Sequence, residues 1–117
     1  MKQPGLLDQL YLFPQIAPHV QTETMGNRCI IVFPRFRNKW MQKYLVPRNR
    51  SPLIRVRLDD HGSAVWQKID GRRTVYDIVE SLASHFDGDD KYELQISIFI
   101  NHLRQEGYIR MLSEPAP

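Results

Sequence analysis

Two stretches in the first half of the chain alternate apolar and polar residues, as strands with one buried face do. They are residues 19–24 and 53–58, and residues 28–33, RCIIVF, also have the composition of a strand. Only the turn-forming residues 25–27 separate the strand at 19–24 from the strand at 28–33, so we expect these two strands to form a hairpin. The pattern predicts three antiparallel strands, the third of which leads directly into a helical region.

The third predicted strand carries different side chains on its two faces. Arg55 and Arg57 share one face, and the other face holds Ile54, Val56 and Leu58. If this strand is an edge of the sheet, its unpaired N–H and C=O groups can accept an extended peptide. We expect one of the N–H groups of Arg55 and Arg57 to face outward and the other to bond within the sheet. The two arginines would attract an acidic peptide, or would only protect the edge from aggregation.

Residues 58–86 predict two short helices separated by a tight turn. Asp59 or Asp60 is placed to cap the first helix, because a carboxylate accepts hydrogen bonds from free backbone N–H groups. Trp66 falls on the apolar side of this helix and is expected to be buried. Gly71 follows, where a left-handed conformation ends the helix. Helix, glycine turn and helix in this order suggest a helix-turn-helix.

The second of these helices begins with Thr74 and Asp77 at capping-box spacing. A third helix is expected up to about residue 105, with a core face of Ile96, Phe99, Ile100 and Leu103. Leu94 and Ile98 lie on a different face of this third helix. An apolar face in so small a domain is expected to be covered by the N-terminal extension, a second subunit or a peptide. A short wing strand at residues 108–112 is expected to follow.

The length of 117 residues predicts a single domain. We expect an N-terminal extension at residues 1–17, one domain at 18–112, and a disordered tail at 113–117. Within the domain, residues 34–52 form a basic connector insertion that is expected to hold a short amphipathic helix. The predicted fold class is α+β and winged-helix-like, with a small three-stranded antiparallel sheet followed by three helices.

Charge is distributed unevenly along the chain. Residues 25–58 hold nine basic and no acidic side chains, whereas residues 59–117 carry a net charge of −5. This asymmetry favours an acidic partner for the first part; alternatively, it is a solvated surface whose two halves partly neutralise each other.

The single cysteine, Cys29, excludes an internal disulfide and indicates a reducing compartment. With no signal peptide and no membrane-spanning stretch in the sequence, we expect a cytoplasmic protein.

Catalytic and metal-binding motifs are missing from the sequence. The four histidines are scattered, and there is no HExxH motif, no CxxC motif and no glycine-rich phosphate loop. The acidic residues 87–90 do not have the spacing of a calcium-binding EF-hand. We therefore expect no enzymatic activity, no metal and no cofactor.

One ordered string of residues resembles the signature of the PqqD family. It runs Leu58-Asp59, Gly62-Ser63, Val65-Trp66, Ile69-Asp70-Gly71, Thr74-Val75 and Ile78-Val79. The resemblance covers roughly residues 54–112, and the basic connector at residues 34–52 is the main departure from the family pattern. It implies a small domain that binds the leader part of a precursor peptide and presents the remainder to a maturase, often a radical S-adenosylmethionine enzyme.

The residues expected to contact such a peptide are Ile54, Arg55, Val56, Arg57, Leu94 and Ile98. Two other functions remain open. One is a nucleic-acid-binding winged helix, favoured by the basic segment and opposed by the acidic second helix, residues 74–86. The other is a homodimeric structural subunit. No membrane partner is expected.

Overall fold

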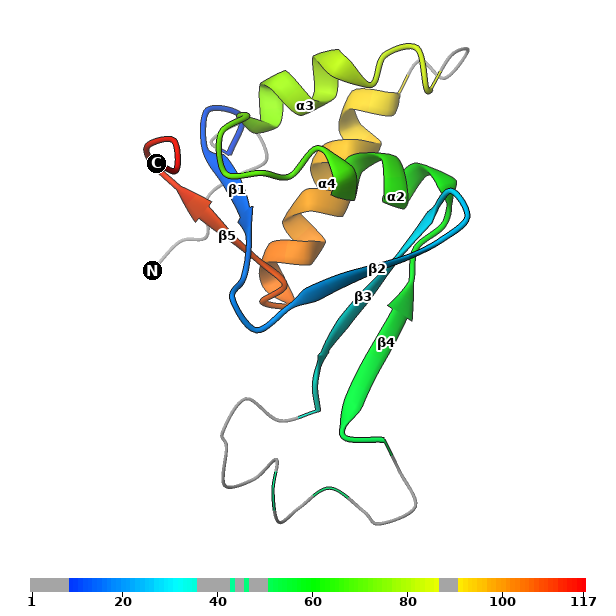
Figure 1. The fold of residues 1–117 in the computed structure, drawn as a ribbon. Coiled ribbons are helices and arrows are strands. Elements are labelled where there is room, and N and C mark those ends of the chain that lie inside the picture. Colours follow the sequence, from blue (N-terminus) through cyan, green and yellow to red (C-terminus); the bar gives the residue numbers. More distant parts are fainter. Residues whose placement is uncertain (1–8, 36–42, 44–45, 47–50, 87–90) are drawn as a thin grey trace.

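The computed structural model describes residues 9–35, 43, 46, 51–86 and 91–117, and its fold is α+β (Figure 1). An antiparallel sheet of order β2-β3-β4 comprises Gln21–Met25, Arg28–Pro34 and Leu53–Arg57. The helices α2, α3 and α4 follow at Asp60–Gln67, Val75–Ser81 and Tyr92–Gln105. A second, two-stranded sheet pairs β1, Phe13–Ile16, with β5, Ile109–Leu112. The predicted fold class is confirmed.

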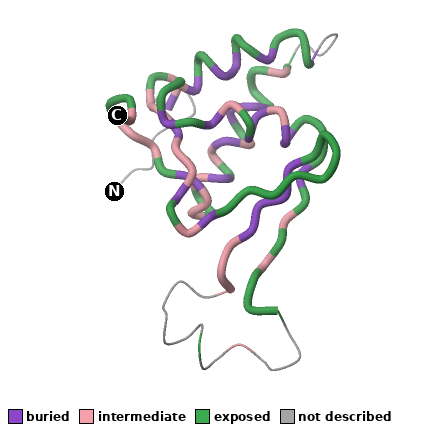
Figure 2. Tube along the Cα trace, viewed as in Figure 1, coloured by how far each residue is buried: buried purple, intermediate pink, exposed green. Residues whose placement is uncertain are grey.

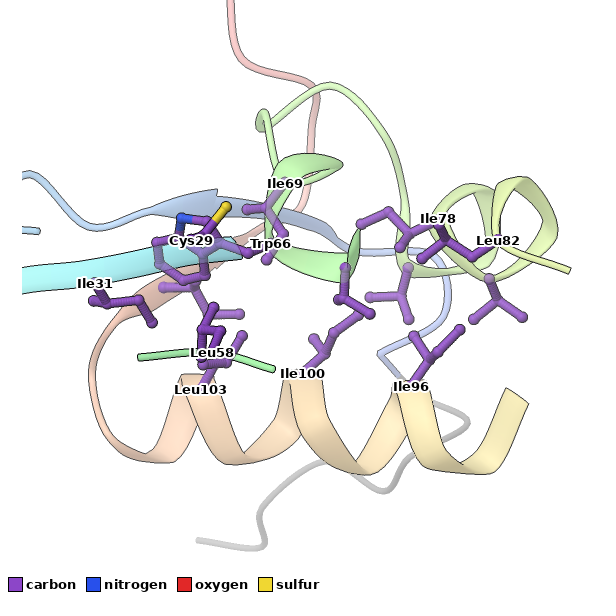
Figure 3. Close-up of a cluster of buried hydrophobic side chains, with 14 of the residues drawn as sticks. Cys29, Ile31, Leu58, Trp66, Ile69, Ile78, Leu82, Ile96, Ile100 and Leu103 are labelled. Carbon is purple, nitrogen blue, oxygen red and sulfur yellow. The ribbon is translucent and has the colours of Figure 1, made fainter. Parts of the chain in front are cut away.

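The central strand β3 is buried along most of its length, whereas its neighbour β2 is exposed throughout (Figure 2). Cys29 and Ile31 point from β3 into the core, which α2, α3 and α4 close from the other side (Figure 3). Trp66 of α2 is only 2% exposed, and its Nε1–H donates to Thr22 Oγ1 at 2.8 Å. The predicted burial of Trp66 is therefore confirmed, and its one polar atom has a partner on β2.

The turn between α2 and α3 uses the local signals that the sequence predicts. Asp59 accepts a hydrogen bond from the Gly62 N–H at 2.7 Å and so caps α2. Gly71 has a φ of +76°, which side chains rarely tolerate. Thr74 and Asp77 form a reciprocal capping box at the start of α3. Together these contacts fix where each helix begins and how the chain turns between them.

Both ends of the described chain pack onto this turn. The backbone oxygens of Leu10 and Leu12 accept from the first free N–H groups of α3, those of Tyr76 and Val75, at 3.0 and 3.1 Å. Residues 113–117, for which the sequence predicted a disordered tail, lie within the described chain, and the Ala116 N–H donates to the Gly71 oxygen at 2.8 Å. The amphipathic helix expected in the basic connector falls within residues 36–50, of which the structure describes only positions 43 and 46.

Replacing Trp66 by alanine should lower the free energy of unfolding by about 3–5 kcal/mol, because a large buried ring leaves a cavity. Urea denaturation followed by circular dichroism would measure the loss. Trp66→Phe should cost less, since it keeps most of the volume and removes the bond to Thr22. Equal, small losses below about 1 kcal/mol in both variants would contradict the central position of Trp66 in the core.

Candidate functional site

β4 lies at one edge of the three-stranded sheet. It pairs with β3 on one side, and the described residues provide no strand on its other side. An edge strand exposes a row of backbone N–H and C=O groups that can bind another extended chain. Which groups face outward depends on the hydrogen-bond pattern between β3 and β4.

The ends of the β3–β4 ladder reveal that pattern. The Leu58 N–H donates to the Cys29 oxygen at 3.0 Å, and the Arg35 N–H donates to the Pro52 oxygen at 2.9 Å. Opposed residues in an antiparallel pair alternate between hydrogen-bonded and non-hydrogen-bonded. With the observed register, the hydrogen-bonded positions of β4 are therefore the even-numbered ones, 54 and 56.

The odd-numbered residues of β4 consequently turn their backbone N–H and C=O groups away from β3. For Leu53 this is visible directly, because its N–H donates to Ser51 Oγ at 3.2 Å and not to β3. Arg55 and Arg57 have the same parity, so both of their N–H groups face outward. The expectation that only one of them does so is wrong, since residues two apart in a strand share the same direction.

Side chains along β4 alternate between two faces. Ile54 and Val56 are half-buried, and Val56 packs against the core on the side of the helices. Arg55 and Arg57 are exposed on the opposite, outer face of the sheet. An extended chain beside β4 would therefore meet an apolar inner face and a basic outer face.

A pocket of about 240 Å³ lies between α2 and α4, next to the end of β4. It is lined by Asp59, His61, Gly62, Val65, Phe86, Gln95, Ile96 and Phe99. The two helices approach closely at Gly62, where an added Cβ would lie 3.3 Å from Phe99 Cζ. Leu58, the residue after β4, lies over α4 near Ile100 and Leu103 (Figure 3). The pocket thus begins at Asp59, two residues after the end of β4, and Phe99 of α4 contributes an apolar part of its lining.

The structure does not bring all six predicted contact residues together. Ile54, Arg55, Val56 and Arg57 share β4, whereas Leu94 and Ile98 are about half exposed on another side of α4. Leu94 lines a separate pocket of about 290 Å³, together with Leu10, Tyr76, Val79, Glu80, Glu93 and Ser97. Phe99 and Gln95 of α4 instead line the pocket that begins two residues after β4.

Sequence reasoning placed Phe99 on the core face of its helix and did not predict that it lines this pocket. Its position in the periodic pattern is that of a core residue, yet the structure leaves it partly buried, at the margin of the packed face. His61 was assigned to a helix start, and the structure adds that its ring stacks on Phe86 at 4.3 Å beside the pocket. Neither feature has a sequence signal, because both depend on how α2 and α4 cross.

The charged groups on the outer face of the sheet differ from those near α4. On the outer face of the sheet, Arg55 Nη2 lies 3.3 Å from Glu23 Oε1, with both side chains about half exposed. Near α4, partial burial followed by the charges of Glu93 and Glu80 raises the pKa of Tyr92 above its usual value. Among the described residues, no three His, Cys, Asp or Glu side chains gather as metal ligands would.

The family model of PqqD, described as coenzyme PQQ synthesis protein D, matches residues 54–109. The match begins in β4, covers α2, α3 and α4, and ends at the start of β5. No curated protein and no solved structure matches the chain. The resemblance found in the sequence is confirmed: residues 54–109 are PqqD-like, and the family's description refers to the synthesis of the coenzyme PQQ. None of the described helices is long and apolar enough to cross a membrane.

The arrangement of α2 and α3 also permits a test of nucleic-acid binding. In a helix-turn-helix the second helix enters the major groove, and here α3 exposes Asp77 and Glu80. Carboxylates on that surface repel phosphate, so duplex DNA should bind with a dissociation constant of about 1 μM or weaker at physiological salt. Fluorescence anisotropy with labelled duplexes would measure this. Sequence-specific binding in the nanomolar range would contradict the assignment of α3 as a helix without a nucleic-acid role.

Proposed function

We propose that this protein is a non-catalytic adaptor that captures a precursor (leader) peptide by strand addition at β4 and presents it to a modifying enzyme, such as a radical SAM maturase. The observation that carries the proposal is the pair of outward-facing backbone groups at Arg55 and Arg57, on a strand edge that has no other strand beside it among the described residues. The PqqD family match supports the same conclusion.

Backbone pairing supplies most of the affinity in this mode of binding, and side-chain pockets supply selectivity. An added strand exchanges hydrogen bonds with Arg55 and Arg57, whose N–H and C=O groups lie two residues apart on one side of β4. Its inward side chains contact Ile54, Val56 and the partly buried Phe99. Leu94 and Ile98 are not needed for this contact, because Leu94 opens into the other pocket.

A homodimeric structural subunit built through this edge is disfavoured by charge. If a second copy paired its own β4 with this one, Arg55 and Arg57 of both copies would face each other on the outer face. Like charges opposite each other across a strand pair are destabilising. The arginines therefore keep the edge available to a chain of different charge.

The proposal extends to the bounds of the domain and to its location in the cell. We propose that residues 18–112 act as one domain, with the N-terminal segment packed onto it through β1 and through Leu10 and Leu12. We place its activity in the cytoplasm, where a buried free thiol such as that of Cys29 remains reduced. A cytoplasmic maturase is the partner that the adaptor would serve.

Proline substitutions in β4 test the proposal. Arg55→Pro and Arg57→Pro should both leave the β3–β4 ladder intact and both abolish capture of a precursor peptide, taken from the short reading frames beside the gene, because each removes an outward N–H group. Val56→Pro should instead damage the sheet, since it removes a bond to β3. Calorimetric titration of the peptide would measure binding, and circular dichroism would measure folding.

Two matched controls isolate the effect of the N–H group. Arg55→Ala removes the side chain but keeps the N–H, and it should retain most of the binding. Thr24→Pro places the same change on β2, the other edge, where position 24 also faces outward; it should bind like wild type. If the folded β4 proline variants bind as well as wild type, or if only Thr24→Pro fails to bind, then the peptide does not pair with β4.

A further inference from the structure

We propose that the peptide recognised at β4 carries acidic residues at alternate positions with apolar residues between them, and that Glu23 acts as a built-in competitor for one of the acidic positions. This inference rests on the proposed function and adds to it the chemical class of the peptide. It follows from the side chains that border the β4 edge on its two faces.

The outer face of the sheet combines exposed basic side chains on β4 with buried apolar side chains on β3. Ile30 and Val32 of β3 alternate with the core residues of that strand, yet they are only 6% and 2% exposed. By register, Arg57 lies beside Ile30 and Arg55 beside Val32. Both arginines are exposed, so this face of the sheet carries two basic side chains at the free edge, next to two buried aliphatic ones.

A strand added to β4 must follow the same alternation. Side chains directly opposite each other in neighbouring strands point to the same face, and successive residues point to opposite faces. The peptide residues opposite Arg55 and Arg57 therefore emerge on the basic outer face. The residues between and beyond them emerge on the inner face, where the half-buried side chains of β4, Ile54 and Val56, are apolar. Carboxylates two residues apart with apolar residues between them satisfy both faces together.

The two arginines are not equally available to a peptide carboxylate. Arg55 is already paired with Glu23, which reaches across β3 from β2 to a distance of 3.3 Å. Within the described part of the chain, Arg57 has no such ion pair. A peptide carboxylate at Arg57 thus gains a new partner, whereas one at Arg55 must share or displace Glu23. Neutralising Glu23 should accordingly strengthen the binding of an acidic peptide.

Three short synthetic peptides test the alternation. The first alternates glutamate and valine, the second has the same composition with all glutamates preceding all valines, and the third alternates lysine and valine. The alternating glutamate peptide should bind about tenfold tighter than its block isomer, because two exposed cross-strand ion pairs contribute roughly threefold each. The lysine peptide should bind weakest, and the preference should shrink as salt rises.

Variants of the protein assign the effect to particular side chains. Arg55→Glu combined with Arg57→Glu should reverse the preference, so that the lysine peptide binds tighter than the glutamate peptide. Glu23→Gln should tighten binding of the alternating glutamate peptide about threefold. Asp60→Asn is the matched control, since Asp60 forms a similar exposed bridge to Arg28 at 3.0 Å but lies on α2. It should leave the affinity unchanged.

The outcomes separate this inference from the proposed function. If the alternating and block peptides bind equally and Arg57→Pro abolishes both, the strand addition stands and the alternation rule is overturned. The same holds if the precursor peptide binds but none of the three synthetic peptides does. If neither the precursor nor any synthetic peptide responds to the β4 proline variants, the proposed function itself is overturned. An unchanged affinity in Glu23→Gln overturns the competitor role of Glu23.

Discussion

The hydrogen-bond ladder between β3 and β4 is the constraint on which the candidate site depends. It commits positions 54 and 56 to the sheet, and therefore leaves the backbone of positions 55 and 57 without a partner in the ladder. The same register puts the apolar side chains of β4 on the core side and its arginines on the outer side. A shift of one residue would reverse both assignments at once. Packing of Val56 against the core resists such a shift.

Features with a local cause were predictable from the sequence. The cap at Asp59, the left-handed glycine at position 71 and the Thr74–Asp77 capping box each involve residues a few positions apart, and the structure contains all three. The burial of Trp66 followed from helical periodicity. In each case the chemistry that determines the conformation lies within one turn of the chain.

Features that depend on distant contacts were not predictable in the same way. The pairing of β1 with β5 joins residues almost a whole chain length apart, and the N-terminal stretch has no alternation that would indicate a strand. The position of Phe99 in the pocket depends on the close approach of α2 and α4 at Gly62. Leu94 and Ile98 were correctly expected to be off the core face, but a helical pattern alone does not say which neighbour that second face approaches.

Gly71 joins three parts of the chain. Its N–H donates to the Pro14 oxygen and its own oxygen accepts from the Ala116 N–H, both at 2.8 Å. The strand β1 and the C-terminal end consequently meet at the α2–α3 turn, across the fold from β4 (Figure 1). A protein domain fused behind residue 117 would therefore emerge from the side opposite the open strand edge. Such a fusion would place the added domain away from β4 and leave that strand edge uncovered.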